Sequence, residues 1–540
     1  IMDLKTLSLE ELRSTDQKVK FEQRTRSIEE VTISIKELLK RPAHFSIIIS
    51  VFDLNELETN GLKKLEEFAL VGMNLSELIS NSLGVLDKAL VLKDDVYSIN
   101  LHNRNNQAIG KILSDLEQIQ TEAIESLGLI DSLIEKMPTD NELSVNLQGL
   151  RVLSQITVDF FRLGELAVSS LTQDENPEQV RSDPHLLNEY QLGQSSRFII
   201  ANDEKFSQLI IALSESQTTL RETKGLATNS EISGLLESVD KLVTQSIESL
   251  KFIHLLAPVV SEILTSDGIR RYLVIGQSND ELRATGGFVF GIWLLIFQDS
   301  RLSDIDYFDV VSVDDINRLE EYPRAPQGLE EHMNAWVWLM RDVAWNPDFP
   351  STARAAQDLF YLGQGIKVDG VIAVNQSSFL NIVNSLGYIT IEKDQEYLTS
   401  EDILTSIETS TDKEGRLYTD KVLKGVIDNI RSLTSMAKVK NLAQSIKTSI
   451  DTRDIYLYSN NLISQQSIMQ LKLDGAIVKT DGDYIFVVDS NVGWSKSDRN
   501  IARHLHYQVD LTKYDSPIGK MKLIYKNHSG VSAAPCEPQW

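Results

Sequence analysis

The distribution of aromatic residues divides this chain near residue 270 and constrains its fold more than any other feature. All six tryptophans and 13 of the 15 tyrosines lie beyond that point. The preceding part is rich in Leu, Ile, Glu, Ser and Lys and contains five of the 12 prolines. The first region therefore has the composition of long helices, and the second that of a sheet-containing domain.

Apolar seams in the first region predict long amphipathic helices. From Leu116 to Met137, and again from Ile232 to Ile253, apolar residues recur at intervals of three and four positions. Such seams usually form an internal helical core, although they can also present a surface to partner helices. We predict an all-α helical domain over residues 1–265, built as a bundle or as coiled-coil-like hairpins. Residues 45–54 contain a β-branched run that fits either a buried helical turn or a short strand.

The second region alternates strand patterns with helical patterns. Helical patterns cover residues 349–362, 377–386 and most of 400–449. Strand patterns cover residues 271–276, 288–298, 370–374, 388–392, 455–458, 476–479, 484–489, 504–511 and 520–525. We predict an α/β layered domain over residues 266–453 and a β-rich C-terminal continuation over residues 454–540, giving an α+β multidomain chain.

Charge and cysteine content exclude several classes of protein. The chain has 53 Lys and Arg against 78 Asp and Glu, a formal charge of −25, so nucleic acid is not an expected partner. The single cysteine, Cys536, excludes an intrachain disulfide and a cysteine-rich metal site. No apolar run approaches the roughly 20 residues that span a bilayer, so we expect the chain as given to be soluble.

Common catalytic and metal-binding signatures are absent. There is no P-loop, no G-x-G-x-x-G after a strand, no H-E-x-x-H and no G-x-S-x-G. His504 and His506 would share one face of a strand, but without a nearby carboxylate a surface position is the simpler interpretation. Five carboxylates could bind a hard cation and fit a solvated acidic loop better: Asp304, Asp306, Asp309, Asp314 and Asp315. We predict no metal site.

Two segments carry residue types that bind anions. Residues 277–288 leave one strand and enter the next through Gly286 and Gly287, whose backbone N–H groups could face an anion, while Arg283 offers a bidentate guanidinium. Residues 336–350 place Arg341 beside Asp342 among three tryptophans and two prolines. An open groove lined by these side chains would indicate a ligand site. A closed Arg and Asp network under the tryptophans would indicate a structural role.

These segments, together with residues 271–274, 368–374 and 489–498, resemble a bacterial envelope family of unknown function, number four thousand and twelve, over roughly residues 270–530. Members of that family usually carry an N-terminal membrane helix, then a helical region, then this domain. The resemblance implies an extracytoplasmic, cell-surface protein, anchored in the membrane through an N-terminal helix that is not present in this chain.

That family is in turn distantly similar to the LytR-CpsA-Psr group, which transfers glycopolymers from a polyprenyl-pyrophosphate carrier to the cell wall. The similarity implies catalytic roles for Arg341 and Asp342, with magnesium as cofactor if the domain is catalytic. It implies ligand binding by the following residues: Arg283, Thr285, Gly286, Gly287 and Arg341. Ala284 and Thr285 follow Arg283 where the group has an aspartate, and Met340 stands where the group has a proline.

Three functions follow as hypotheses. The first is an envelope protein that binds or assembles a lipid-phosphate or glycopolymer ligand. The second is an active glycopolymer or phosphosugar transferase that uses Arg283, Arg341 and Asp342. The third is a surface-layer or filament subunit, in which the helical half mediates self-assembly or contacts protein partners.

Overall fold

The computed structural model describes residues 106–135, 142–172, 184–226, 230–264, 267–391, 396–409, 413–433, 436–492, 496–512 and 517–529. The expectations for residues 45–54 and for Cys536 lie outside these ranges. The chain divides into two compact units. Unit 1 comprises Ile1–Asp174 and Ala201–His254, and unit 2 comprises Glu175–Ile200 and Leu255–Trp540. A helical segment that precedes the aromatic region in the sequence therefore belongs to the sheet-containing unit.

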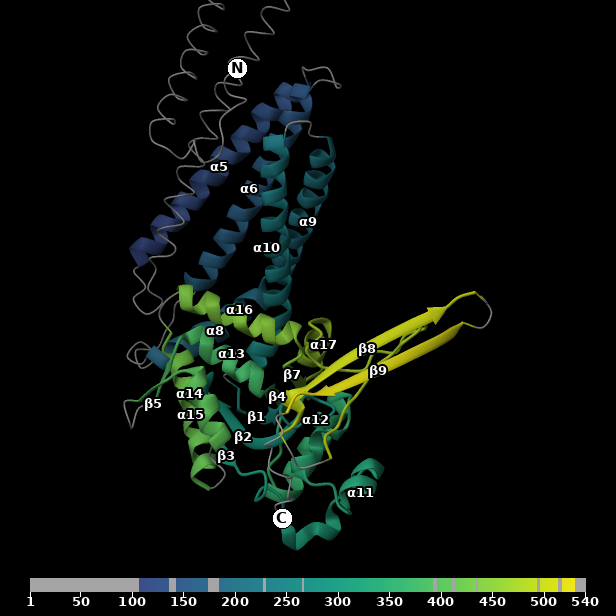
Figure 1. Cartoon of the computed structure of the whole chain (residues 1–540). Coiled ribbons are helices and arrows are strands. Elements are labelled where there is room, and N and C mark those ends of the chain that lie inside the picture. Colours follow the sequence, from purple (N-terminus) through teal and green to yellow (C-terminus); the bar gives the residue numbers. More distant parts are fainter. Residues whose placement is uncertain are drawn as a thin grey trace, which may run out of the picture. The chain divides into compact units, whose positions relative to one another are not determined.

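Unit 1 contains the helices that carry the two apolar seams (Figure 1). They are α5 (Asn106–Glu135), α6 (Glu142–Thr172), α9 (Asp203–Leu226) and the first part of α10 (Ser230–Ile263). Helix α6 packs against both α5 and α9. Leu236 and Val243 of the second seam are fully buried, in one cluster with Leu213 and Leu220 of α9. In unit 1 the described part of this seam is thus mainly helical core.

A five-stranded mixed sheet organises unit 2. Its order is β3-β2-β1-β4-β7, and only β1 and β4 run parallel. The strands are β1 (Ile269–Ser278), β2 (Phe288–Gln298), β3 (Arg301–Phe308), β4 (Gly370–Asn375) and β7 (Ile455–Ser459). Because β7 pairs with β4, this sheet continues beyond residue 453. The predicted class, helices followed by a mixed α+β part, is confirmed at this coarse level.

Helices of unit 2 pack against the sheet and against one another. They are α8 (Pro184–Ala201), α11 (Gln327–Met333), α12 (Phe349–Gln364), α13 (Gln376–Leu386), α14 (Ser400–Thr409), α15 (Lys413–Arg431), α16 (Met436–Asp451) and α17 (Leu462–Gln470). Leu273 and Ile275 of β1 are buried in one cluster with Phe349 and Phe360 of α12. Helices α13 to α16 form a second core with the short strands β5 (Ile389–Ile391) and β6 (Glu396–Leu398).

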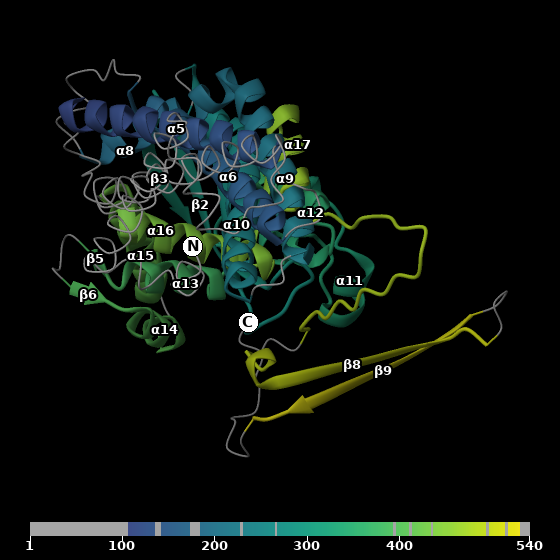
Figure 2. The ribbon, with the colours of Figure 1, turned by 90° about the horizontal axis from the view of Figure 1, so that it is seen from above.

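The last described part of unit 2 is a two-stranded ribbon. Strands β8 (Ile501–Asp510) and β9 (Ile518–Asn527) pair antiparallel along their whole length. The predicted strands over 476–479 and 484–489 do not form, because these residues pair with no other strand, and a bend lies between them at residues 481–482. Figure 2 shows this excursion and the ribbon projecting in the same direction. Alternating apolar residues specify extended backbone, but a strand also needs a paired neighbour.

Of the helices in the described ranges, none combines the length and the hydropathy needed to cross a bilayer.

Candidate ligand-binding site

The structure brings the predicted site residues together at the carboxyl end of β1. Four of them lie on the loop between β1 and β2, and the other two lie on the 3-10 helix η4 (Met340–Trp345). In chain order they are Arg283, Thr285, Gly286, Gly287, Arg341 and Asp342. The Thr285 N–H donates to the carbonyl of Ala344 at 3.3 Å, which ties the loop to η4.

The paired glycines allow the loop to lie against the end of β1. Gly287 has φ +155°, and a Cβ at this position would stand 2.0 Å from the carbonyl oxygen of Ser278. At Gly286, with φ +122°, a Cβ would stand 2.8 Å from Oε1 of Gln277. The close approach of two backbones explains Gly287, and the positive φ with the nearby Gln277 side chain explains Gly286. The N–H of Gly286 donates to the carbonyl of Arg283 at 3.1 Å, which closes a turn.

Arg283 is the centre of a closed charged cluster. Its side chain is fully buried, with Nη2 3.3 Å from Glu281 Oε1 and 3.5 Å from Asp342 Oδ1. Nη1 donates to the carbonyls of Leu282 and Asn491, and the guanidinium lies 5.5 Å from the ring centre of Phe288. Burial raises the pKa of Glu281, and the nearby Arg283 opposes that rise. The positive charge of Arg283 is therefore already matched by two carboxylates.

Arg341 occupies the more accessible side of the same cluster. Its Nε lies 3.4 Å from Asp342 Oδ2, and its side chain is 37% exposed, against 6% for Asp342. The indole Nε1 of Trp338 donates to the backbone carbonyl of Asp342 at 3.0 Å. Of the two arginines, only Arg341 has substantial exposure to solvent. Ligand binding by Arg341 and by the loop residues stays a prediction.

Sequence inspection missed one carboxylate of this cluster. Asp314, assigned to an acidic loop, is 8% exposed and accepts the N–H of Met340 at 3.1 Å. Burial raises the pKa of Asp314 to about 6, while the Met340 N–H and Arg341 oppose the rise. In the sequence, only its position one residue after the apolar Val313 could have indicated that Asp314 is buried.

Residues 489–498, noted above only through the family resemblance, clamp the loop that carries Arg283. Asn491 donates its N–H to the carbonyl of Leu282 at 2.9 Å, and the Leu282 N–H donates to Asp498 at 3.1 Å. Arg499 adds an ion pair to Asp280 at 2.8 Å. This segment is therefore part of the reason that Arg283 is buried.

An apolar cavity lies between the sheet and helices α13, α14 and α15. Its volume is about 170 Å³, and it is partly open to solvent. Polar residues in its wall are few, the amides of Asn375 and Gln376 among them. The apolar wall comes from Val274, Phe290, Trp293, Val374, Phe379, Ile382, Ile403, Tyr418, Val422, Leu423, Val426, Ile427 and Ile430. Because these residues are distant in sequence, no sequence motif predicts the cavity.

An irregularity in β2 builds the sheet side of the cavity. The register between β1 and β2 shifts after Gly276, which places Phe290 beside Trp293. A Cβ at Gly276 or at Gly291 would stand 2.8 Å or 2.7 Å from the indole ring of Trp293, so both glycines make room for it. The indole Nε1 of Trp293 is buried and has no hydrogen-bond partner. A buried donor of this kind is costly unless a ligand or water satisfies it.

The cavity and the charged cluster both lie near the carboxyl ends of β1 and β4, on opposite faces of the sheet. Val274 lines the cavity, whereas the next residue, Ile275, packs in one core with Val343 of η4. Gln277 of β1 connects the two regions, because it pairs in register with Asn375 of the cavity wall and donates to Thr285 Oγ1 at 3.4 Å. In sheets with parallel strands, ligands commonly bind beyond the carboxyl ends of those strands. An apolar cavity and a charged cluster therefore share these strand ends.

Within the described ranges, no group of three or more His, Cys, Asp and Glu side chains is arranged to hold a metal ion. His504 and His506 lie on one face of β8, as their spacing predicts, and both are exposed.

Residues 267–411 match the family described as "Protein of unknown function (DUF4012)". The expected family resemblance is thus confirmed for this segment, which contains β1 to β4 and the charged cluster. No curated protein matches the chain.

Three solved structures are similar in part. TagV of Bacillus subtilis is 12% identical over 39% of this chain and 81% of its own, with a TM-score of 0.25. The Lin1025 protein of Listeria innocua is 11% identical over 38% and 79%, with a TM-score of 0.23. The B. subtilis protein titled transcriptional regulator yvhJ is 9% identical over 48% and 92%, with a TM-score of 0.24.

Proposed function

We propose that the α/β part of unit 2 binds the apolar chain of a lipid phosphate and thereby acts as a binding or assembly component of the bacterial envelope. The apolar cavity between the sheet and helices α13 to α15 carries this proposal. An almost wholly apolar wall selects a hydrocarbon chain over a sugar or a nucleotide.

The rim of the cavity supplies the polar half of such a ligand's site. Trp293 offers a buried N–H without a partner, and Asn375 and Gln376 offer amide groups. Arg341 is the cation of the adjacent cluster that solvent reaches, and an arginine fork suits a phosphate. An oxygen-bearing headgroup at this edge, with its chain in the cavity, satisfies both features.

Binding without transfer is the better supported of the two envelope roles. The Arg283 guanidinium, which the transferase hypothesis assigns to a pyrophosphate, is buried against Glu281 and Asp342. The Asp342 carboxylate lies between Arg283 and Arg341 and thus already has two cationic neighbours. The envelope location is part of this proposal and rests on the family resemblance over residues 267–411.

Calorimetric titration of the whole chain with three probes tests the proposal. Farnesyl phosphate supplies a chain and a phosphate, farnesol supplies the chain with a hydroxyl, and inorganic phosphate supplies the headgroup alone. We expect both farnesyl probes to bind and inorganic phosphate not to bind, because apolar burial provides most of the free energy. Arg341→Ala should weaken farnesyl phosphate about tenfold and leave farnesol unchanged, because a charge-assisted pair is worth roughly 1.4 kcal/mol or more.

A matched pair of substitutions on α15 locates the chain. Leu423→Trp fills the cavity, whereas Lys421→Trp places the same side chain at an exposed position of the same helix. We expect Leu423→Trp to abolish binding of both farnesyl probes and Lys421→Trp to leave it intact, with thermal unfolding as the check on folding. Farnesyl binding that survives Leu423→Trp, or no farnesyl binding to the unmodified chain, would contradict the proposal.

A further inference from the structure

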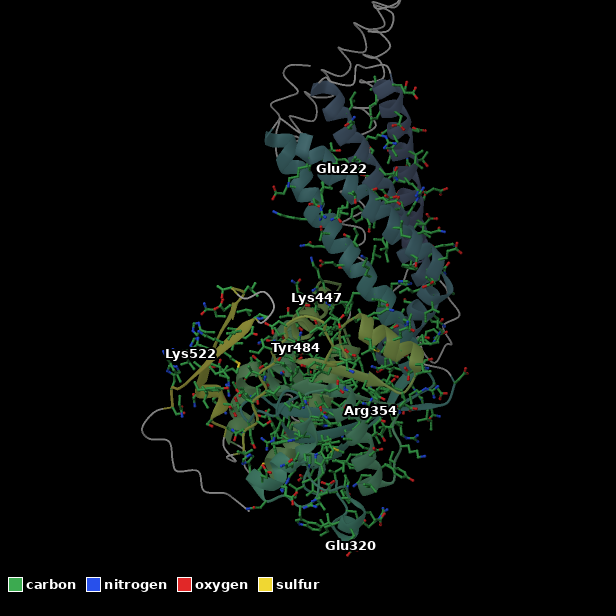
Figure 3. All side chains as sticks on the ribbon, turned by 90° about the vertical axis from the view of Figure 1, so that its right-hand side faces the viewer. Glu222, Glu320, Arg354, Lys447, Tyr484 and Lys522 are labelled. Atoms are coloured by element: carbon green, nitrogen blue, oxygen red, sulfur yellow. The ribbon has the colours of Figure 1, made fainter. Side chains whose placement is uncertain are left out.

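The β8–β9 ribbon has two chemically different faces. Cross-strand partners share a face, so the register groups Leu505 with Leu523 and Tyr507 with Met521. The apolar face consists of Leu505, Tyr507, Val509, Met521, Leu523 and Tyr525. The opposite, lysine face consists of His504, His506, Gln508, Lys520, Lys522, Ile524 and Lys526. Figure 3 labels Lys522 on this ribbon. This division is typical of a sheet that is solvated on one side and packed on the other.

The apolar face is exposed in this chain. Its six side chains are between 36% and 53% exposed. The adjacent segment 476–489 adds seven large apolar side chains that are between 37% and 74% exposed, Tyr484 and Phe486 among them. With side chains of this size, the exposed apolar surface is on the order of 1,000 Å², which exceeds the few hundred Å² usual for a monomer. It also exceeds the roughly 800 Å² per partner of a standard interface.

The chain itself holds the segment 476–489 on the apolar side of the ribbon. Tyr507 donates its hydroxyl proton to Asp483 at 2.6 Å, and Tyr525 donates to Asp489 at 2.9 Å. Arg503, which shares this face, pairs with Asp489 at 2.6 Å. Contacts at residues 483 and 489 fix both ends of the second arm, residues 483–489, and orient it antiparallel to β8. The carboxylates of Asp483 and Asp489 are thereby satisfied, and the five residues between them carry no charge.

We infer that this surface binds the same surface of a second copy of the chain, as a two-fold symmetric sandwich of ribbons. A C2 contact requires a self-complementary patch, and a mainly apolar patch whose Arg503 is paired with Asp489, with the ribbon lysines on the far side, meets that requirement. The local net charge also favours association of two copies through this region. Residues 476–527 contain eight Lys and Arg against six Asp and Glu, whereas the chain as a whole carries −25. Two copies approach with least repulsion through this region.

A lipid surface fits the same patch less well. In the described ranges β8 and β9 pair with no third strand, so the outer edge of each strand presents unpaired backbone groups. Inside hydrocarbon such groups are not satisfied, and open sheet edges are excluded there. A protein sheet packed on the apolar face leaves those edges in water or pairs with them.

Sedimentation velocity of the whole chain over a range of concentrations tests the inference. We expect a monomer–dimer equilibrium that Leu505→Lys weakens at least tenfold, because a buried lysine would face its symmetry mate. Gln508→Lys, on the lysine face of the same strand, is the matched control and should leave the equilibrium unchanged. Both positions are exposed, so circular dichroism and thermal unfolding should match the unmodified chain.

Disulfide trapping provides a second readout that does not depend on affinity. In a Cys536→Ser background, Leu505→Cys should form an intermolecular disulfide on mild oxidation, whereas His506→Cys, one residue along and on the opposite face, should not. A monomer at all concentrations, equal trapping at both positions, or binding of the monomer to anionic phosphatidylglycerol vesicles through Leu505 would overturn the inference.

Discussion

The charged cluster around Arg283 and the apolar cavity beneath Trp293 lie at the same edge of one sheet and differ in what the chain itself satisfies. In the cluster, Arg283 is matched by Glu281 and Asp342, and Trp338 donates to a backbone carbonyl. Both regions contain buried atoms without a hydrogen bond: Arg283 Nε and Asp342 Oδ1 in the cluster, and the indole Nε1 of Trp293 in the cavity. The cluster matches its charges within the chain, whereas the cavity leaves room for a ligand.

Removing Arg283 should produce the largest effect. Arg283→Met keeps most of the side-chain volume but leaves Glu281 and Asp342 buried without their cation, which should cost about 3–5 kcal/mol of the free energy of unfolding. Burial already raises the pKa of Glu281, so the loss should become smaller as the pH falls and this carboxyl accepts a proton. Urea unfolding followed by circular dichroism measures the loss at each pH.

Arg341→Met is the control for that substitution. Its side chain is 37% exposed, and an ion pair with this exposure contributes about 1 kcal/mol or less. Equal losses from the two substitutions would show that Arg283 is not the buried centre of the cluster.

The loop that carries Arg283 should tolerate no side chain at its second glycine. Gly287→Ala would place a Cβ 2.0 Å from the carbonyl oxygen of Ser278, at φ +155°. We expect a loss of about 2–4 kcal/mol, because backbone must move on both sides of the contact. Gly365→Ala is the control, since Gly365 has φ +70° with nothing within 4 Å of its Cβ, and it should cost only about 1–2 kcal/mol. Equal losses at the two sites would mean that the backbone contact with β1 is unimportant.

Asp314 gives the cluster a pH dependence of definite sign. Burial raises the pKa of Asp314 in the folded state from 3.8 to about 6, so the folded protein binds this proton more tightly than the unfolded chain does. This contribution favours folding most at low pH and is lost as the pH rises through 6. Asp314→Asn, which can still accept the Met340 N–H, should therefore match the unmodified chain near pH 4. At pH 8 it should be more stable by up to about 3 kcal/mol.

Chemical denaturation at both pH values measures this difference. Asp358→Asn, at an exposed position of α12, controls for the loss of one negative charge from an acidic chain. A stability difference for Asp314→Asn that shrinks as the pH rises would contradict the assignment.

The sequence predicts the strands of unit 2 better than it predicts the contacts that form the charged cluster and the cavity. Strands β1, β2 and β4 were expected because each is a run of apolar residues, whereas β3 was missed because Arg301, Asp304 and Asp306 break its apolar pattern. A closed network of Arg283 with Asp342 was one of the two alternatives that the sequence left open, and the structure contains this ion pair. The sequence did not predict that the carbonyl of Asn491 accepts a hydrogen bond from Arg283, since the two residues lie about 200 positions apart.

The cavity had no signal at all in the sequence. Val274, Trp293 and Leu423 line it, and each is an apolar residue in an element with the pattern of an ordinary core. Whether two apolar surfaces close on each other or stand apart depends on how the helices pack, and the hydrophobic pattern is the same in both cases. Residues 476–479 and 484–489 show the same limitation of sequence patterns. Their composition is typical of strands, but it does not reveal whether a neighbouring strand is present to pair with them.

The smallest expected effect concerns the two indole donors that define the comparison. Trp293→Phe removes a buried N–H that has no partner, so the loss of apolar contact is offset and stability should change by about 1 kcal/mol or less. Trp338→Phe removes an N–H that donates to the backbone carbonyl of Asp342 at 3.0 Å and should cost about 1–2 kcal/mol, because this hydrogen bond is lost.

With farnesol present, the order of the two stability losses should reverse. Trp293→Phe should then lose part of the stabilisation that the ligand provides, and Trp338→Phe should keep it, as thermal shifts at a fixed farnesol concentration would show. A larger loss from Trp293→Phe without ligand would mean that this indole already has a hydrogen-bond partner in the free chain, and the distinction between the two regions would fail.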